Sequence, residues 1–415
     1  MERLSSISSH LSAQPTSGVS KLTEKNPDDV VITAAFRTPL TKGGKGALAE
    51  VSSAELVMLL LKGVLERTQI DPKLVEDVAF GNVCNPGAGA NEHRAASLAA
   101  GLPYTSAFVA INRQCSSGLM AVNEIANRIT AGQIDVGIGG GVESMSMNYG
   151  PRMIPNYPAS FMNHPEAANC LIPMGTTSEN VATKYGITRR DQDEFAASSY
   201  QKAAKAQEAG YFKDEIIPIK ATIIDEDGNN KEIFSDHDDG IRRGVTADSL
   251  GKLRPAFDED GSTTAGNASQ VSDGAGAVLL MRRSVAEKLG QPILAKYVHM
   301  KTVGVPPEIM GVGPAYAIPA LLKDLNITKD DVDIYEINEA FASQALFSIR
   351  HVGIDINKVN PKGGAIAFGH PLGATGARQF ATLLTELKRT GKKIGVTSMC
   401  IGTGMGAASL VVSEQ

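Results

Sequence analysis

Two cysteines, Cys115 and Cys400, each lie in a glycine-rich turn. Cys115 stands between an apolar run at 107–112, typical of a strand, and a run at 119–129, typical of a helix. A sulfur at the start of a helix meets the positive end of the helix dipole and free amide groups, which favour a thiolate. We therefore predict exposed, reactive thiols at both positions, against the alternative that each is a small apolar core residue.

Two further turns carry polar side chains of catalytic type. Asn338 follows a predicted strand at 334–337, and His370 lies between Gly369 and Pro371. Because glycine and proline offer little side chain to cover an imidazole, we predict that His370 is accessible and functional. The alternative is a structural histidine in the core.

The order of elements repeats along the chain. The run at 78–82 matches 334–338, and the strand, turn and helix around Cys115 match 364–376. The segments 135–141 and 272–280 match the paired runs 394–399 and 404–412. Since internal repeats determine the whole fold, we predict an α/β protein made of two duplicated halves.

The repeat implies that a long segment interrupts the first half. The predicted divisions are an N-terminal segment at 1–27, a first half at 28–145 and 270–292, an inserted loop domain at 146–269, and a second half at 293–415. The insertion contains a predicted helix at 189–208 and an acidic loop at 225–239, and it is interpreted as a lid. The acidic loop lacks the alternating spacing and closing Glu of a calcium loop, so no metal site is expected.

Composition excludes several classes of function. A net charge of −5 and a pI near 5.9 leave no basic field for nucleic acid, and an aromatic content of 5% without Trp gives few stacking platforms. Four cysteines without a C-x-x-C pair fit neither a zinc site nor a secreted disulfide framework. The longest apolar stretch, near 56–61, is far short of the roughly 18 residues that cross a bilayer. We expect neither nucleic-acid binding nor a membrane span.

The first 27 residues form an appendage rich in Ser, Thr and Lys. Within them, Arg3-Leu4, five residues, and His10-Leu11 resemble the type-2 peroxisomal targeting signal. Residues seven apart return to one face of a helix, so Arg3 lies above His10 and Leu4 above Leu11. This predicts an import receptor as a partner and the peroxisomal matrix as the location. A chance match in a disordered tail and a mitochondrial presequence are the alternatives.

Together, the turns at Cys115, 338–341, 369–371 and Cys400-x-Gly402 occur in an order that resembles the thiolase family, closest to the peroxisomal 3-ketoacyl-CoA thiolases. The resemblance covers the chain after residue 28. It implies a five-layered α-β-α-β-α fold with a loop domain over the active site, and a homodimer or homotetramer. The implied activity is thiolytic cleavage of 3-ketoacyl-CoA by CoA, with CoA as a substrate and no cofactor.

The resemblance also implies the role of each residue. Cys115 is the nucleophile that becomes acylated, His370 activates it, and Cys400 is the general acid and base. Asn338 holds a water that, with His370, stabilises the enolate of the departing acetyl-CoA, and the backbone N–H groups of Cys115 and Gly402 stabilise the C3 alkoxide. Glycine at 402 is expected to allow close approach of the backbone, and Cys400 is expected to have a pKa near neutral.

Substrate contacts follow from the same resemblance. Ser269 is expected beside the pantetheine arm, Arg242 beside the CoA nucleotide, and Met310 and Phe341 at the acyl end. The sequence departs from short-chain biosynthetic thiolases at Pro173, where they have His. This favours the degradative class over the alternative of an acetoacetyl-CoA thiolase.

Three other functions were weighed. A β-ketoacyl synthase shares a duplicated fold and a cysteine nucleophile but lacks a counterpart of Cys400. A nucleotide-binding oxidoreductase is suggested by Gly402-x-Gly404-x-x-Ala407, yet too little chain follows for a dinucleotide site. A catalytically inactive carrier predicts the loss of at least one motif, and none is lost.

Overall fold

The computed structural model describes residues 18–150, 157–224 and 228–415. The predicted targeting residues Arg3, Leu4, His10 and Leu11 lie outside the described residues. So do residues 225–227 of the acidic run.

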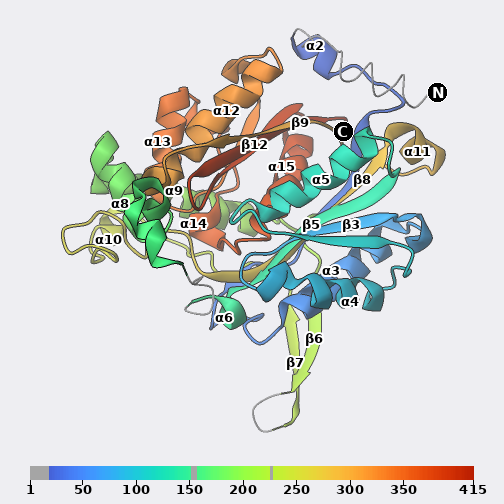
Figure 1. Cartoon of the computed structure of the whole chain (residues 1–415), viewed down its shortest axis with the longest axis horizontal. Coiled ribbons are helices and arrows are strands. Elements are labelled where there is room, and N and C mark those ends of the chain that lie inside the picture. The colour runs from blue at the N-terminus through green and yellow to red at the C-terminus, as the bar shows by residue number, and fades with distance from the viewer. Residues whose placement is uncertain (1–17, 151–156, 225–227) are drawn as a thin grey trace.

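The described chain is built around a ten-stranded sheet with the order β10-β11-β12-β9-β1-β8-β5-β3-β4 and the short β2 beside β8 (Figure 1). The strands are β1 (Val30–Arg37), β2 (Thr41–Lys42), β3 (Asp77–Gly81), β4 (Ala107–Ile111), β5 (Val136–Ser144), β8 (Ser272–Arg282), β9 (Ala295–Gly304), β10 (Ile334–Ile337), β11 (Ile394–Ile401) and β12 (Met405–Ser413). The β1–β9 pair joins two similar halves at its centre, through Val31 and Ile32.

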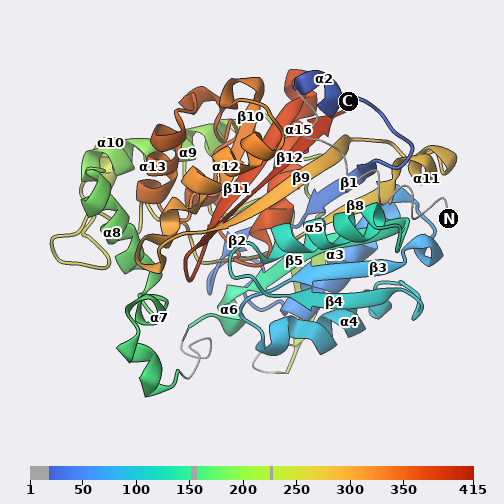
Figure 2. The ribbon, with the colours of Figure 1, turned by 45° about the horizontal axis from the view of Figure 1, so that its top comes forward.

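The sheet and helices form five layers, as predicted (Figure 2). The helices of these layers are α3 (Ser53–Thr68), α4 (Ala90–Ala99), α5 (Ser117–Thr130), α12 (Gly313–Asp324), α13 (Ala342–Val352) and α15 (Thr375–Thr390). Helices α5 and α15 pack against each other between the two halves of the sheet. Helix α3 covers the outer face of the first half, with α4 packed beside it, and α12 covers the outer face of the second half, with α13 beside it.

The predicted repeat is visible in the strand pairing. Strand β3 pairs in parallel with β5, as β10 does with β11, and the antiparallel pairs β5–β8 and β11–β12 follow. One predicted match is wrong. No strand precedes the turn at 364–376; the edge strand of the second half is reduced to an isolated bridge between Tyr335 and Val359, followed by the four-residue helix α14 (Ala365–Phe368).

Glycines allow the two central helices to meet at their N-termini. A Cβ on Gly118 would lie 2.5 Å from the carbonyl oxygen of Gly373, and one on Gly376 would lie 2.2 Å from the amide nitrogen of Leu119. Such distances exclude any side chain at either position. The turn that carries Cys115 and the turn that carries His370 are therefore pressed together at the centre of the molecule.

The segment between β5 and β8 lies outside the repeat. Its elements are α6 (Met145–Asn148), α7 (Pro165–Asn169), α8 (Met174–Tyr185), α9 (Arg189–Glu208), the strands β6 (Ile219–Ile224) and β7 (Asn230–Ser235), and α10 (Ala247–Leu250). The helix predicted at 189–208 is confirmed as α9. The acidic loop predicted at 225–239 is wrong in part, because residues 230–235 form a strand of a hairpin that projects from the body (Figure 1).

A buried cluster of charges connects this segment to both halves. Arg37 of β1 donates to Asp238 at 2.7 and 2.8 Å and to Glu215 at 2.7 Å, and Lys362 donates to Glu215 at 2.7 Å. All four side chains are buried. Burial by itself raises the pKa of Glu215, but Lys362 and Arg37 hold that pKa at about 2. Removing one partner would leave a buried charge uncompensated.

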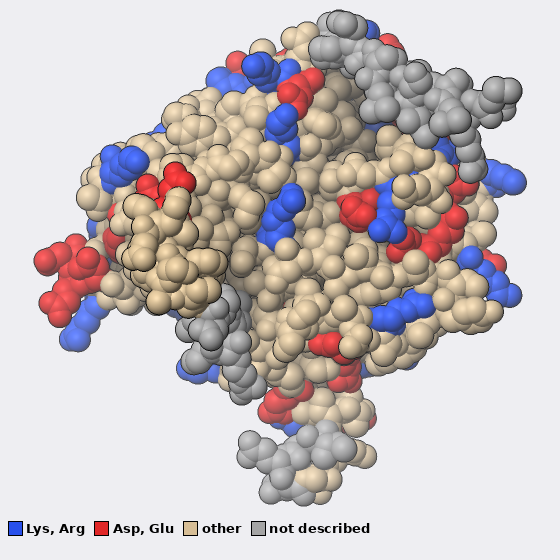
Figure 3. Space-filling view, in the orientation of Figure 1, with Lys and Arg blue, Asp and Glu red and all other residues tan. Residues whose placement is uncertain are grey.

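The surface shows no sign of a polyanion site on the face drawn in Figure 3, where Lys and Arg side chains are scattered among Asp and Glu. Among the described residues, none of the helices combines the length and the apolar character that crossing a membrane requires. No group of three or more His, Cys, Asp or Glu side chains within the same ranges is arranged to hold a metal ion.

Candidate active site

Cys115 lies in the turn between β4 and α5, two residues before the helix begins. Gln114, just before it, has a left-handed φ of 48°. A residue other than glycine in this region costs roughly 1 kcal/mol or more, and such strain is concentrated at functional sites. The prediction of an exposed sulfur is wrong, because Cys115 is only 9% exposed. The second half packs over the turn, which sequence neighbours alone do not reveal.

The prediction of a thiolate at Cys115 is also wrong for the substrate-free protein. Burial raises the pKa of the thiol to about 11, and the charge of Glu143 acts in the same direction. The backbone N–H groups of Gly402 and of Cys115 itself hydrogen-bond the sulfur and oppose this shift. Cys115 is therefore a thiol in the substrate-free protein, and it would have to lose its proton in order to act as a nucleophile.

Cys400 lies near the end of β11 and is fully buried, so the prediction of an exposed sulfur is wrong here as well. It packs in a small apolar cluster with Met310 and Ala340, flanked by Met174 and Phe341. Burial raises the pKa of Cys400 far above its ordinary value, and the charge of Cys115 contributes in the same direction. The expected near-neutral pKa is therefore wrong. The action of Cys115 on Cys400 places the two sulfurs in the same site.

His370 is 4% exposed, against the prediction of an accessible imidazole. Its Nε2 lies 3.2 Å from Nδ2 of Asn338, and its Nδ1 lies 2.6 Å from Oγ1 of Thr375. Burial, together with the charge of Arg378, lowers the pKa of His370 to about 3. The ring is therefore neutral in the resting protein and has one nitrogen free to accept a proton.

Asn338 is held at the end of β10 by its backbone. Its N–H donates to the carbonyl of Ser398 at 2.9 Å, and its carbonyl accepts from Gln344 at 2.8 Å. The side-chain Oδ1 is buried and has no hydrogen-bond partner among the described residues. Because buried polar atoms are almost always paired, this oxygen suits a water or a substrate group.

Gly402 follows β11, and its N–H points at the sulfur of Cys115. No contact within the described residues requires glycine at this position, so the expected approach of the backbone to substrate stays a prediction. A Cβ on Gly402 would touch only the side chain of Gln114, at an ordinary 3.6 Å. The turn instead requires glycine at 404, where φ is 96° and a Cβ would lie 2.5 Å from the carbonyl of Val305.

Sequence reasoning missed Glu143, which connects the two halves at the site. Its buried carboxylate accepts from Nδ2 of Asn82 at 2.9 Å and from the backbone N–H groups of Val83, Cys84 and Gly373 at 2.9–3.1 Å. Gly373 lies three residues after His370, so this carboxylate holds the histidine turn against the first half. The signal available in the sequence was an acidic residue ending a glycine-rich strand.

The residues predicted to contact substrate are only partly brought together. Ser269 donates its N–H to the carbonyl of Ala340 at 2.9 Å, beside Phe341. Met310 is buried against Cys400. Arg242 lies apart on an exposed turn after β7.

The two arginines of that turn differ. Arg243 pairs with Glu208 at 3.2 Å. Among the residues that the structure describes, Arg242 has no such partner, and its charge acts on the hydroxyl of Tyr200 in α9. An unpaired, exposed guanidinium is the better candidate for an anionic ligand.

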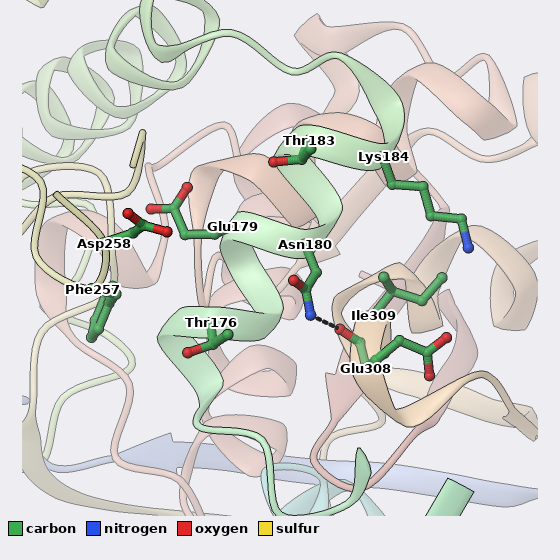
Figure 4. A pocket seen from close by; sticks show the side chains of 9 residues that line it. All are labelled: Thr176, Glu179, Asn180, Thr183, Lys184, Phe257, Asp258, Glu308 and Ile309. Atoms are coloured by element: carbon green, nitrogen blue, oxygen red, sulfur yellow. Dashed lines mark hydrogen bonds between the residues drawn. The ribbon is translucent and has the colours of Figure 1, made fainter. Parts of the chain in front are cut away.

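A cavity of about 420 Å³ lies beside the candidate active site, between α8 and the 3₁₀ segment Pro307–Val312 (Figure 4). Its edge includes Phe257, whose ring packs against Phe341 with centroids 6.2 Å apart. Glu179, Asp258 and Glu308 also line it, with Lys184 as the one cation among the lining side chains. This excess of carboxylates disfavours the anionic nucleotide of CoA and an apolar acyl tail.

The segment that nearly matches a dinucleotide fingerprint, Gly402-x-Gly404-x-x-Ala407, has a structural role. The turn from Gly402 to Gly404 connects the antiparallel strands β11 and β12. A dinucleotide site requires a helix after such a turn. The sequence-based rejection of an oxidoreductase is therefore supported by the fold.

Comparison with known proteins was made on the whole chain. The family model for the N-terminal domain of thiolase matches residues 30–284, and the model for the C-terminal domain matches residues 291–413. A curated relative, the peroxisomal 3-ketoacyl-CoA thiolase of Yarrowia lipolytica, is 68% identical over 414 residues, covering 100% of both chains.

Two solved structures are also similar. The dimeric peroxisomal thiolase of Saccharomyces cerevisiae, at 1.8 Å, is 56% identical with a TM-score of 0.89, over 95% of this chain and 100% of that one. A 2.8 Å structure of peroxisomal 3-ketoacyl-CoA thiolase from the same yeast has a TM-score of 0.79 and 52% identity, over 94% of this chain and 99% of that one. It is described as five-layered, with two core domains of identical topology.

Proposed function

The chain belongs to the thiolase family, and from this premise we propose that it cleaves 3-ketoacyl-CoA with CoA, giving acetyl-CoA and a shortened acyl-CoA in fatty-acid β-oxidation. The observation that carries the proposal is the meeting of two buried thiols, Cys115 and Cys400, with the hydrogen-bonded pair of Asn338 and His370. One thiol alone would allow acyl transfer, but carbon–carbon cleavage also needs a proton donor for the carbon that leaves.

In the first half-reaction, Cys115 attacks the C3 carbonyl while its proton passes to Nε2 of His370. The carbon–oxygen π pair moves to oxygen and forms an alkoxide. The N–H groups of Cys115 and Gly402, already aimed at the sulfur, are placed to stabilise it. When the carbonyl re-forms, the C2–C3 bond breaks, and its electron pair becomes the enolate of acetyl-CoA.

Cys400 then gives its proton to C2 of the enolate, and acetyl-CoA leaves. The enolate oxygen is stabilised by His370 and by a water held on Oδ1 of Asn338, the buried atom without a partner. Because burial raises the pKa of Cys400, the resulting thiolate is a stronger base than the thiolate of CoA. It takes the proton of the incoming CoA, whose sulfur attacks acyl-Cys115, and His370 returns its proton to the released Cys115.

The scheme needs no cofactor. Every step is a nucleophilic attack or a proton transfer, and the side chains above supply each group. CoA is a substrate. We propose Ser269 beside the pantetheine arm and Arg242 beside the nucleotide, with Met310 and Phe341 at the acyl end. Support comes from the contact of Ser269 with Ala340 and from the unpaired charge of Arg242.

The degradative direction is supported by the segment before α8. Pro173 starts this helix where the short-chain class has a His, and Met174 packs beside Cys400 without adding a hydrogen-bond donor. The alternative is an acetoacetyl-CoA thiolase. Measuring kcat/KM for CoA-dependent cleavage of 3-ketoacyl-CoA from four to sixteen carbons tests the proposal. We expect medium and long chains to react at least as well as acetoacetyl-CoA, and activity restricted to four carbons would establish the alternative.

We also propose that the protein is a homodimer or a pair of dimers. Strand β4 lies at the edge of the sheet, and its apolar residues Phe108, Val109 and Ile111 remain partly exposed. An apolar edge strand that is left uncovered promotes association, and a second copy would cover it with two-fold symmetry. Sedimentation at micromolar concentration distinguishes dimer, tetramer and monomer, and a monomer would contradict the proposal.

The division of the chain is proposed as residues 28–145 with 270–292, the insertion 146–269, and residues 293–415. Residues 1–27 are proposed to bind an import receptor that delivers the protein to the peroxisomal matrix. The test is a fluorescent reporter fused to residues 1–27, with Leu4→Arg and His10→Asp as inactive versions. A reporter that stays in the cytosol or enters mitochondria with the intact segment would refute this address.

A further inference from the structure

Thr375, the first residue of α15, contacts the ring nitrogen of His370 that does not face Asn338. Its Oγ1 lies 2.6 Å from Nδ1 of His370 and 3.0 Å from the carbonyl oxygen of Pro371. The side chain is fully buried. No solvent competes for these contacts, so the hydroxyl and the imidazole determine each other's protonation pattern.

The donors and acceptors can be counted. A threonine hydroxyl has one proton, and the Pro371 carbonyl can only accept. If the hydroxyl donates to Pro371, its oxygen accepts from Nδ1, so the proton of the neutral ring is on Nδ1. Nε2 is then unprotonated and accepts from the amide of Asn338 at 3.2 Å. Each contact in this chain has one donor and one acceptor.

The opposite assignment has a chemical cost. If Thr375 donated to Nδ1, the ring proton would be on Nε2, and Asn338 would have to present its oxygen to His370. Nε2 would then be unable to accept a proton from Cys115. The tautomer of a catalytic histidine is commonly set by the group on its other nitrogen.

We infer that Thr375 is a positioning residue that holds His370 in the tautomer with a proton on Nδ1, and so keeps Nε2 ready to accept the proton of Cys115. This inference rests on the proposed function and deepens it. The transfer is balanced: the Cys115 sulfur loses its proton to Nε2 as it bonds to the acyl carbon, and the proton returns when the acyl group leaves.

The local backbone fixes the same geometry. The N–H of His370 donates to the carbonyl of Gln270 at 3.2 Å, and the N–H of Thr375 donates to Pro371 at 3.0 Å. The turn from His370 to Thr375 is therefore closed on itself. A hydroxyl at 375 can reach Nδ1 without a change in the backbone, and a serine there would keep the same oxygen.

The test compares Thr375→Val with Thr375→Ser in the full-length protein. Acetyl-CoA is mixed with enzyme, and acylation of Cys115 is followed by quenched-flow intact mass. We expect Thr375→Val to acylate about 10²-fold more slowly, the order of magnitude of general-base assistance, with KM unchanged. Thr375→Ser should stay within about threefold of the wild type.

Thr397→Val is the matched control. Thr397 is buried in β11, and its hydroxyl has no hydrogen-bond partner among the described residues. The same loss of one hydroxyl should therefore leave acylation unchanged. A slowdown in Thr397→Val equal to that in Thr375→Val would assign the effect to general damage and overturn the inference.

Nitrogen NMR of the wild type, labelled with ¹⁵N-histidine, reads the tautomer directly in the unaltered enzyme. His370→Asn identifies the His370 signals by their loss. We expect the shift of a protonated nitrogen at Nδ1 and of an unprotonated one at Nε2. A proton on Nε2, or a Thr375→Val enzyme that acylates at the wild-type rate, would overturn the inference. Failure of the wild type to acylate Cys115 would instead refute the proposed function.

Discussion

Two asparagines, Asn82 and Asn338, occupy the same place in the two halves but differ in their hydrogen bonds. Asn82 follows β3 as Asn338 follows β10. The amide of Asn82 is fully used, since Nδ2 donates to Val142 and Glu143 and Oδ1 accepts from the N–H of Asn85. Within the part of the chain that the structure describes, the side chain of Asn338 has one contact, to His370, and its buried Oδ1 has no partner.

This difference shows how a duplicated fold acquires an active site. At the same backbone position, an asparagine whose polar atoms are all hydrogen-bonded stabilises the scaffold. An asparagine with an unpaired polar atom is available for chemistry. The first half provides the nucleophile and the carboxylate of Glu143 that anchors the histidine turn. The second half provides His370, Asn338 and Cys400, the groups that we propose move protons or stabilise charge.

The largest effect is expected from the nucleophile of the first half. Because a serine hydroxyl is far less acidic than a thiol, Cys115→Ser should lose several orders of magnitude in kcat. Peptide mapping after exposure to substrate without CoA should show the acyl group on Cys115 only. Cys170→Ser, which changes a partly exposed cysteine, is the control and should remain active. An adduct on Cys400 with Cys115 unmodified would reverse the assignment of the two halves.

Within the second half, His370→Ala and Cys400→Ala should fail at different steps. Loss of His370 removes the proton acceptor and an enolate donor, and an oxyanion donor alone is typically worth about 10²–10³ in rate. Acylation of Cys115 by an acyl-CoA should therefore be slowed mainly in His370→Ala. Cys400→Ala should still acylate but fail to cleave 3-ketoacyl-CoA. If Cys400→Ala abolished acylation while His370→Ala acylated normally, these roles would be exchanged.

The two asparagines give the direct test of the comparison. Asn338→Ala should lower kcat by about 10²-fold with little loss of stability, because Oδ1 has no protein partner. Asn82→Ala should mainly lower the free energy of unfolding, by about 1–3 kcal/mol, because it leaves buried groups of Glu143 and Asn85 unpaired. Urea unfolding and steady-state kinetics on both variants measure this. Equal losses of stability would contradict the distinction.

The last comparison concerns two buried histidines, one from each half. Burial lowers the folded-state pKa of His93 to about 4 and of His370 to about 3, against an ordinary value of 6.5. The unfolded chain therefore binds more protons, and stability that is complete above pH 6.5 is lost as the pH falls towards 4. Each histidine contributes about 1.4 kcal/mol per pH unit in this window.

His93→Gln should reduce the slope of the free energy of unfolding against pH between pH 6.5 and 4. The reduction should correspond to at most one proton taken up on unfolding, and calorimetry across this range measures the slope. The wild type, measured in the same buffers, is the reference for the slope. An unchanged slope in His93→Gln would show that His93 is not neutral in the folded protein.

The regular elements could be predicted from the sequence because their signals are local. The alternating and apolar runs at 78–82 and 334–338 became β3 and β10, and the helix at 189–208 became α9. The positions of Cys115, Asn338 and His370 followed from turns at the ends of such elements. The internal repeat was enough to predict that these residues from the two halves meet.

The burial of the thiols could not be predicted in the same way. The glycine-rich character of the turns suggested exposure, but Gly118 near Cys115 allows α5 and α15 to touch. Cys115 is buried in the folded chain. The pKa of each thiol depends on this long-range packing. Thr375 was missed because its role is visible only once the ring of His370 has an orientation, and the hairpin β6–β7 was missed because polar residues dominate its outer strand.

The four buried charges around Arg37 bear on how this enzyme can be re-engineered. Exchange of the segment 146–269 between related enzymes is one way to alter the residues around the site. That segment supplies both carboxylates of the cluster, Glu215 and Asp238, whereas Arg37 and Lys362 come from the two halves. A transplanted segment without these carboxylates would leave two buried cations, Arg37 and Lys362, without carboxylate partners. In a successful chimera, the residues at positions 37 and 362 must therefore be chosen together with the incoming segment.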